Sequence, residues 1–365
     1  MPVLEKIVIS DFRNIQLQEL EFSPNVNCIS GNNGEGKTNL LDAIYYLAMT
    51  KSAFASSDKF ALRHGCDEFS LAGTYRMENS LQSRFALKMS SKGEKKIKRD
   101  DKPYQKISEH VGVLPVVMVS PADVSMVSES GEERRRFVNS VLSQMDREYM
   151  SAMQQYNRFL LQRNTILKEP SFDRSLLEVI DMRLSCLAEP IYQARKKFVE
   201  QLKPIVSEYY KFLSGDSEQV DIEYESELSK AGLDQLLASS FERDRIMKHT
   251  TVGVHRDDFA FKMNGHPIRR FGSQGQQKSF LVSLKFAQYE IMKRNYGFAP
   301  ILLLDDVFDK LDMGRISNLL QMVASNDFGQ IFITDSNKVR MAGIVDRLTQ
   351  DRAYFETVGG TFTRI

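Results

Sequence analysis

The sequence predicts an α/β protein whose main lobe is assembled from the two ends of the chain and interrupted by a helical insertion. Residues 25–30 form an apolar strand that leads into a glycine-rich turn and an amphipathic helix over 38–49. A second apolar strand, residues 301–304, lies far away in the sequence and ends in two aspartates. Between these strands, apolar residues recur at helical spacing from about Gly131 to Phe212.

The remaining elements of the main lobe are mostly strands. Alternating or continuous apolar runs predict strands at residues 3–9, at several places between 69 and 100, at 113–119, in a hairpin over 258–268 and at 330–334. Asn264-Gly265 supplies the turn of the hairpin. A helix is expected after the glycine-rich segment 272–277. The predicted domains are a lobe formed by residues 1–120 with 296–365 and a helical lobe over 121–295.

The helical insertion carries two apolar seams, which predict a pair of antiparallel helices. The second seam runs from residue 177 to residue 212 and contains Pro190 and Pro204, which should kink or break it. An unbroken helix over that range would span roughly 54 Å at about 1.5 Å per residue. We therefore expect a short stub rather than a rod.

Composition bounds the function only loosely. The 49 basic and 48 acidic side chains give a net charge of +1, which excludes a globally basic DNA binder but leaves room for a local basic patch. No run of eighteen apolar residues and no leader pattern occurs, so no membrane association is expected. Cys28, Cys66 and Cys186 are too few and too scattered for a disulfide framework or a zinc site, which indicates a reducing, cytoplasmic location.

The strongest motif is the segment Gly31-Asn32-Asn33-Gly34-Glu35-Gly36-Lys37-Thr38. Two glycines five residues apart, followed by Lys-Thr between a strand and a helix, are typical of a phosphate-binding loop. Glycines let the backbone N–H groups point at phosphates, and the start of the helix adds its dipole. Lys37 would supply charge to the β- and γ-phosphates, and the Thr38 hydroxyl would bind Mg²⁺.

The acidic end of strand 301–304 complements that loop. Its four apolar residues suit a central parallel strand covered on both faces. Asp305 is placed to hold Mg²⁺ opposite Thr38, and Asp306 is placed to act as a general base or to orient the attacking water. Loop and strand end together predict binding of ATP with Mg²⁺ and, less directly, hydrolysis.

A third motif, Phe271 to Lys278, opens the helix that precedes the acidic strand. Its Ser273-Gln274-Gly275-Gln276 core resembles the signature motif of ABC-type ATPases in the RecF and SMC class. The physics agrees, because a serine at a helix N-terminus makes a second anion site. Since the chain already has a phosphate loop, this site is predicted to serve a nucleotide held by another subunit.

Further segments resemble RecF proteins in the expected order and cover nearly the whole chain. They are Asp11 to Asn14, Asn39 to Ile44, Ser120 to Asp123, Arg134 to Arg136, Gly253 to Asp258 and Asp309 to Asp312. The departures are Val254 where proline is expected, Asn139 where aspartate is expected, and Thr334 where transporter-type ATPases keep a histidine.

The resemblance implies an ABC-type P-loop ATPase head with an inserted helical arm. The implied ATP contacts are Arg13, Gly31, Asn32, Asn33, Gly34, Glu35, Gly36, Lys37, Thr38 and Asn39. It also implies an ATP-dependent homodimer on gapped DNA with single- and double-stranded parts, and a weak, DNA-stimulated ATPase that acts as a switch. The implied process is recombinational repair, with replication restart, the SOS response and the RecO and RecR proteins as partners.

The residues that contact DNA cannot be predicted from the sequence. Residues 92–102 hold six basic side chains and Arg134 to Arg136 add three, but either set suits a solvated surface as well as it suits phosphates. Two other classes stay open. One is the ATPase subunit of a membrane transporter, and the other is the head of an SMC-like tether. A third, non-enzymatic interpretation, in which the protein binds ATP and hydrolysis is incidental, also stays open.

Overall fold

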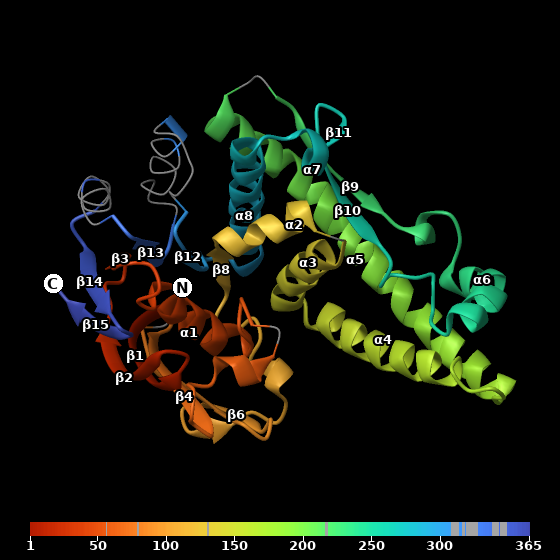
Figure 1. Cartoon of the computed structure of the whole chain (residues 1–365), viewed down its shortest axis with the longest axis horizontal. Coiled ribbons are helices and arrows are strands. Elements are labelled where there is room, and N and C mark those ends of the chain that lie inside the picture. The colour runs from red at the N-terminus through yellow and green to blue at the C-terminus, as the bar shows by residue number, and fades with distance from the viewer. Residues whose placement is uncertain are drawn as a thin grey trace. The chain divides into compact units, whose positions relative to one another are not determined.

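The computed structural model describes residues 1–55, 57–78, 80–129, 131–215, 218–307, 314–315, 318, 328–337, 343 and 349–365. These fall into two compact units (Figure 1). The first comprises Met1–Val124, Phe212–Ser214 and Leu281–Ile365, and the second Ser125–Lys211 and Gly215–Phe280. The division falls after Val124 and Phe280, whereas the sequence suggested residues 120 and 295. Most of helix α8 (Gln274–Tyr296) therefore belongs with the first unit.

The central sheet of the first unit joins both ends of the chain, as the sequence predicted. Its strand order is β15-β14-β3-β13-β12-β8. The bounds are β3 Val26–Ser30, β8 Val116–Val119, β12 Ile301–Leu304, β13 Ile331–Asp335, β14 Arg352–Val358 and β15 Thr361–Arg364. Every residue of β3, β8, β12 and β13 is buried, as expected for parallel strands covered on both faces.

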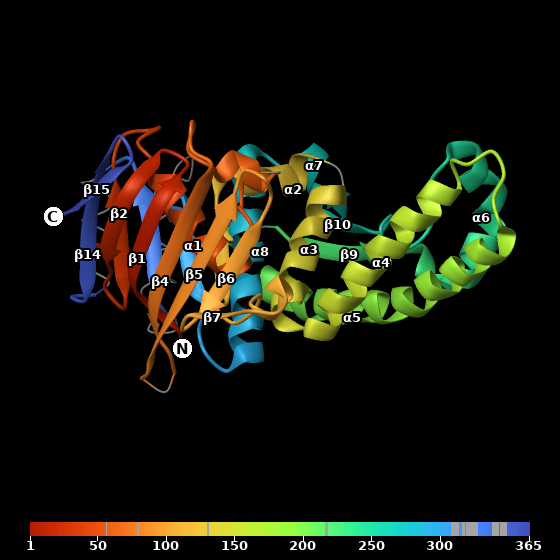
Figure 2. The ribbon, with the colours of Figure 1, turned by 90° about the horizontal axis from the view of Figure 1, so that it is seen from below.

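A second, antiparallel sheet completes this unit (Figure 2). Its order is β2-β1-β4-β5-β6-β7, with β1 Val3–Phe12, β2 Ile15–Glu21, β4 Glu68–Arg76, β5 Gln82–Ser90, β6 Lys95–Arg99 and β7 Lys102–Pro103. Helix α1 (Lys37–Met49) lies between the two sheets, because its buried residues share one apolar cluster with both. Short 3₁₀ turns cover Asp58–Ala61, Ile107–Glu109 and Pro121–Val124.

The second unit is mainly helical. Its helices are α2 Ser125–Ser128, α3 Gly131–Met145, α4 Arg147–Ile166, α5 Arg174–Ser214 (whose last residues fall in the first unit), α6 Leu233–Met247 and α7 Ile268–Phe271, with a 3₁₀ turn at Glu227–Ser229. A small sheet, β11-β10-β9, comprises His266–Pro267, Asp258–Met263 and Val220–Glu225. The hairpin turn at Asn264-Gly265 is confirmed, with left-handed φ values of 48° and 79°.

Helix α5 corrects one prediction. It runs for 41 residues through both Pro190 and Pro204, so the expected break, and with it the short stub, is wrong. At about 1.5 Å per residue the helix spans roughly 60 Å. Both prolines are exposed, and so are Cys186 and Glu200, four residues earlier, whose carbonyls lose their helical donor. Because the freed carbonyls lie on the solvated side, the opposite face of the helix stays buried, and Figure 2 shows α5 as one continuous helix.

Two buried arginines form ion pairs between different elements of the second unit. Arg163 of α4 is fully buried and binds Asp181 at 2.6 Å and Asp244 at 2.7 Å. Arg195 of α5 pairs with Asp257 at 2.7 Å and donates to the Asn139 side-chain oxygen at 3.0 Å. Asn139, the departure noted above, therefore still supplies one oxygen to a buried guanidinium.

Gln330 links the two ends of the chain in the first unit. Its side-chain amide accepts the N–H of Leu4 at 2.8 Å and donates to the carbonyls of Leu4 and Ser23, each at 2.8 Å. Gln330 is only 1% exposed, so these backbone groups have little access to water as an alternative partner.

We predict that Gln330→Leu lowers the free energy of unfolding by about 2 kcal/mol, because it leaves a buried N–H without its acceptor. Urea denaturation followed by circular dichroism measures this change. The exposed Gln16→Leu on β2 is the matched control and should stay close to the wild type. Equal stability of both variants would show that the Gln330 bonds contribute nothing.

Candidate nucleotide-binding site

The phosphate loop lies where the sequence predicted it, between β3 and α1. Gly34 and Gly36 adopt left-handed φ values of 87° and 105°, which side chains other than glycine disfavour. Gly36 is the N-cap of α1, and no side chain caps this end of the helix. The loop thus presents backbone N–H groups together with a helix dipole, which is the arrangement that binds phosphate.

Lys37 curls back over its own loop. Its Nζ donates to the carbonyl of Gly31 at 2.8 Å and to that of Asn32 at 3.0 Å. The residue is only 4% exposed. A buried ammonium beside these carbonyls lies close to where the loop would hold phosphate oxygens.

Thr38 and Asp305 meet although 267 residues separate them. The Thr38 hydroxyl lies 3.0 Å from Asp305 Oδ1 and 2.9 Å from Oδ2. Asp305 is 3% exposed, and this burial raises the pKa of its carboxyl group. A hydroxyl and a carboxylate that converge beside a phosphate loop are the oxygen ligands Mg²⁺ takes in such proteins, so the residues fit the ion.

Asp306 follows at the end of β12 with a φ of 43°, in the left-handed region. Its N–H donates to the Thr334 hydroxyl at 3.0 Å. A non-glycine residue held in this region costs of order 1 kcal/mol or more, and such strain clusters at functional sites. Asp306, the predicted general base, is therefore also the residue with a strained backbone at the end of β12.

Arg13, which the resemblance assigns to the nucleotide, is bound to α1 in this structure. Its guanidinium pairs with Asp42 at 2.6 Å and donates to the Ser52 hydroxyl at 3.0 Å. Asp42 is fully buried, and burial raises the pKa of its carboxyl group against the lowering effect of Arg13. Contact between Arg13 and a nucleotide stays a prediction.

The C-terminal hairpin braces the phosphate loop, which sequence reasoning missed. The carbonyl of Glu35 accepts the N–H of Gly360 at 2.9 Å and the Thr357 hydroxyl at 3.0 Å. The Glu35 carboxylate also accepts the N–H of Gly359. The Gly359-Gly360 pair was the available signal, but it indicates only a turn and not what the turn contacts.

A second brace comes from the turn after β1. The side chain of Asn14 accepts from Asn39 Nδ2 at 2.7 Å and contacts the Glu35 carbonyl at 3.4 Å. Asn39 was predicted to contact ATP, and here it anchors Asn14 from the first turn of α1. The loop is therefore held by segments from both ends of the chain.

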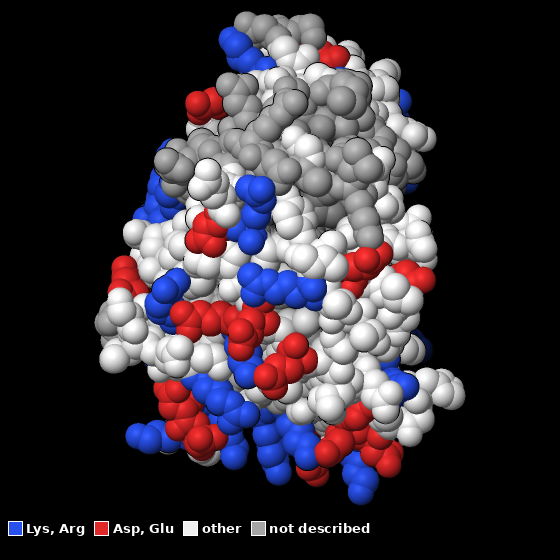
Figure 3. All heavy atoms as spheres, turned by 90° about the vertical axis from the view of Figure 1, so that its left-hand side faces the viewer, with Lys and Arg blue, Asp and Glu red and all other residues white. Residues whose placement is uncertain are grey.

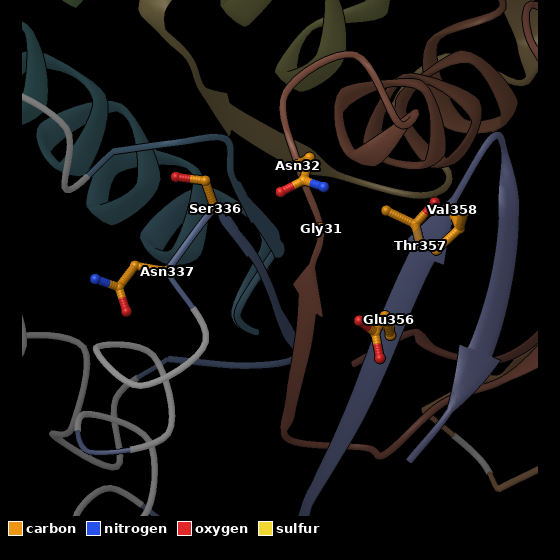
Figure 4. Close-up of a pocket in the computed structure, with 7 residues that line it drawn as sticks. All are labelled: Gly31, Asn32, Ser336, Asn337, Glu356, Thr357 and Val358. Atoms are coloured by element: carbon orange, nitrogen blue, oxygen red, sulfur yellow. The ribbon is translucent and has the colours of Figure 1, made fainter.

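A polar pocket of about 420 Å³ adjoins the loop (Figure 4). It is lined by Gly31, Asn32, Ser336, Asn337, Glu356, Thr357 and Val358. Figure 4 shows Gly31 and Asn32 between the Ser336–Asn337 segment on one side and β14 on the other. The pocket lies at the carboxyl ends of β3 and β13 and beside the end of β14, where parallel α/β sheets bind their ligands.

The signature segment lies at the start of α8, in the second unit. Ser273 and Gln276 form a reciprocal cap, in which the Ser273 N–H donates to Gln276 Oε1 at 2.6 Å and the Gln276 N–H to Ser273 Oγ at 3.3 Å. The Gln276 amide also donates to Glu218, which the sequence did not single out. Ser273 and Gln274 are exposed and Gly275 is half-buried, so the helix start is open to a ligand.

Most of the arginine run is engaged within the second unit. Arg134 forms a bidentate salt bridge with the Asp258 carboxylate, with bonds of 2.8 and 2.9 Å. Arg135 donates to the Asp257 backbone carbonyl at 2.7 Å. Arg136 is exposed, and it pairs with the neighbouring Glu133 at 2.6 Å. Arg134 and Arg135 therefore have structural partners, and Arg136 is the exposed member of the run.

His255 is a structural residue. Its Nδ1 accepts the Tyr156 hydroxyl at 2.9 Å, and its Nε2 lies 3.1 Å from the Thr250 carbonyl. Burial lowers the pKa of His255 to about 4, so the ring is neutral at physiological pH.

Among the six basic residues within 92–102, Lys95 pairs with Asp58 at 2.7 Å and the others are exposed.

Charge on the face shown in Figure 3 is mixed, with lysine and arginine side chains interspersed among aspartate and glutamate.

Asp309 to Asp312, which resemble the loop that follows the acidic strand in RecF proteins, lie outside the described residues. Within the described part of the chain, no helix is long and apolar enough to cross a membrane.

Comparison with known proteins identifies close relatives. Residues 3–351 match the family model described as the RecF/RecN/SMC N terminal domain. The chain is 44% identical over 358 residues to the DNA replication and repair protein RecF of Parabacteroides distasonis, with 98% of each chain covered. It is 40% identical over 364 residues to RecF of Bacteroides fragilis, covering 100% of this chain and 98% of the relative.

Two solved structures have the same fold as this chain. The recombination mediator protein RecF-ATP of the RecFOR pathway superposes with a TM-score of 0.91 and 29% identity, over 100% of this chain and 98% of that chain. The Smc head domain from Pyrococcus furiosus, bound to the C-terminal domain of ScpA, gives a TM-score of 0.59 and 14% identity, over 100% and 96%. The second likeness shows the fold alone, and it confirms the predicted ATPase-head architecture.

The brace on the phosphate loop can be tested at two adjacent glycines. We predict that Gly360→Ala weakens ATP binding about tenfold, or about 1.4 kcal/mol. A Cβ at Gly360 would lie 2.4 Å from the Asn14 carbonyl oxygen. At Gly359, which also has a positive φ, an added Cβ would meet nothing within 4 Å, so Gly359→Ala is the matched control.

Fluorescence titration with a labelled ATP analogue measures both variants, and their melting temperatures show whether each one folds. A wild-type affinity in a folded Gly360→Ala variant would mean that the hairpin does not shape the loop.

Proposed function

This chain belongs to the RecF/RecN/SMC family and is similar to RecF proteins along nearly its whole length, and on that premise we propose that it is an ATP-controlled DNA-binding protein of recombinational repair. One observation in the structure carries the proposal. Thr38, from the phosphate loop, and Asp305, from the acidic strand end, converge within 3.0 Å in a buried site. An aspartate carboxylate is seldom fully buried unless it is paired or binds a metal ion.

The nucleotide part of the proposal follows from the loop. Lys37 would exchange its bonds to the loop carbonyls for bonds to the β- and γ-phosphates, at little cost because it is already desolvated. Thr38 and Asp305 would hold Mg²⁺, which when bound would offset the charge of the phosphate oxygens. Asp306 would orient or deprotonate the attacking water.

Dimer formation is the second part of the proposal. The exposed start of α8, with Ser273, Gln274, Gly275 and Gln276, would bind the γ-phosphate of an ATP held by a second copy of the chain. Contacts to the γ-phosphate exist only before hydrolysis, so ATP would close the dimer and hydrolysis would open it. A slow, DNA-stimulated ATPase fits such a switch.

DNA and partner proteins form the third part, which rests on the relatives. We propose that the closed dimer binds gapped DNA at junctions of single and double strands, together with RecO and RecR proteins, in replication restart and the SOS response. Its DNA-facing surface would be positive although the chain carries a net charge of +1. The three cysteines, which are scattered along the sequence, fit the reducing cytoplasm where this process would occur.

The transporter-subunit and SMC-tether alternatives are less favoured. The relatives named RecF align over 98% of their own lengths, whereas the Smc head shares 14% identity. The longest helix among the described residues, α5, has 41 residues, which is short for an SMC-type coiled coil.

Fluorescence anisotropy of a labelled gapped duplex, at one stated salt concentration with and without ATP, tests the function. We expect ATP to strengthen binding by about tenfold or more, and Lys37→Met to abolish that increase because the variant cannot hold the γ-phosphate. Asp306→Asn should keep ATP-dependent binding while slowing hydrolysis by about a hundredfold or more, so that the complex persists.

The exposed Lys59→Met is the control for charge and should behave like the wild type. DNA binding that is equal with and without ATP would contradict the switch. Full ATP turnover in both Lys37→Met and Asp306→Asn would contradict the residue assignments.

A further inference from the structure

Thr334 is a buried hydroxyl in an otherwise apolar stretch of β13. Ile331, Phe332 and Ile333 precede it, all of them buried, and Thr334 itself is 0% exposed. A valine would fill the same space and suit a strand equally well. A buried hydroxyl is unfavourable unless it is hydrogen-bonded, so its partners indicate what it does there.

Both partners belong to the acidic strand end. Thr334 Oγ1 donates to Asp305 Oδ1 at 2.7 Å and accepts the N–H of Asp306 at 3.0 Å. A hydroxyl has one proton, and the Asp306 amide can only donate, so the directions of both bonds are fixed. One side chain therefore holds the carboxylate of the first aspartate and the backbone of the second.

The second bond falls on a strained residue. Asp306 has a φ of 43°, in the left-handed region that is uncommon for residues other than glycine. This φ determines where the Asp306 side chain leaves the strand end. The bond from Thr334 restrains the same peptide and so helps to fix that direction.

The first bond complements the one from Thr38. The Asp305 carboxylate lies within 3.0 Å of the hydroxyls of Thr38 and Thr334. The oxygen of Thr38 would also serve as a ligand of Mg²⁺, so its bond to Asp305 would have to accommodate the ion. Thr334 would have no such second task, and it holds the carboxylate from the neighbouring strand.

We propose that Thr334 is a positioning residue that sets Asp305 toward Mg²⁺ and Asp306 toward the attacking water through one hydroxyl. The inference rests on the proposed ATPase function and deepens it. Groups that orient metal ligands typically change metal affinity or activity by about 10- to 100-fold when they are removed.

The test compares Thr334→Val, which keeps the shape and loses the hydroxyl, with Thr334→Ser, which keeps the hydroxyl. Binding of a fluorescent ATP analogue to the full chain in EDTA should be unchanged in both variants, because the phosphate loop is intact. A Mg²⁺ titration of the melting temperature with ATP present should have a midpoint about tenfold higher in Thr334→Val. Its kcat should fall by about 10- to 100-fold with little change in KM, and Thr334→Ser should restore both values.

Thr334→Ala provides a second variant without the hydroxyl, in case valine disturbs the strand. A wild-type Mg²⁺ midpoint and kcat in a folded hydroxyl-free variant would overturn the inference. So would failure of Thr334→Ser to restore them, since that result indicates a packing role.

The wild-type protein separates this inference from the proposed function. If the wild type binds Mg²⁺ and ATP and Thr334→Val matches it, only the role of Thr334 is lost. If the wild type itself neither binds nor hydrolyses ATP, the proposed function fails, and this inference fails with it.

Discussion

The parallel pairing of β3 with β13 is the constraint on which the rest of the site depends. Val26 to Ser30 pair in register with Ile331 to Asp335, so segments some 300 residues apart end at the same edge of one sheet. Strand β12 pairs with β13 on its other side and ends at that edge too. Because the carboxyl ends of parallel strands lie at the same edge of a sheet, the phosphate loop and Asp305 meet although they are far apart in the sequence. A one-residue slip would turn every side chain of β13 to the opposite face.

Around this edge, short-range bonds connect groups that are distant in sequence. The carbonyl of Glu35 is held by Gly360 and Thr357, while Thr334 joins Asp305 to Asp306. Each bond is modest alone, but buried and connected hydrogen bonds restrain one another. The phosphate loop is thereby pre-formed, and binding of phosphate needs little further ordering of the chain. Such a site suits the proposed switch, in which the protein responds to the presence or absence of the γ-phosphate of ATP.

Local patterns predicted much of this arrangement, and the misses share a physical cause. The phosphate loop, the buried strands and the Asn264-Gly265 hairpin depend on neighbours in sequence, so spacing and residue type were sufficient. The brace from Gly360 and the Thr334 bonds depend on tertiary contacts that leave no local pattern. The break expected at Pro190 failed for the same reason, since solvent exposure of that face decided the outcome.

A mixing experiment tests the central claim that each ATP is shared between two chains. Lys37→Met should disable the phosphate loop, and Ser273→Arg should block the signature segment, so neither variant alone is expected to dimerise with ATP. A heterodimer of the two has one site in which both halves are intact. Light scattering coupled to size-exclusion chromatography in ATP should therefore show dimer in the equimolar mixture and monomer in each variant alone. Monomer in the mixture as well, with dimer in the wild type, would contradict a site built from two subunits.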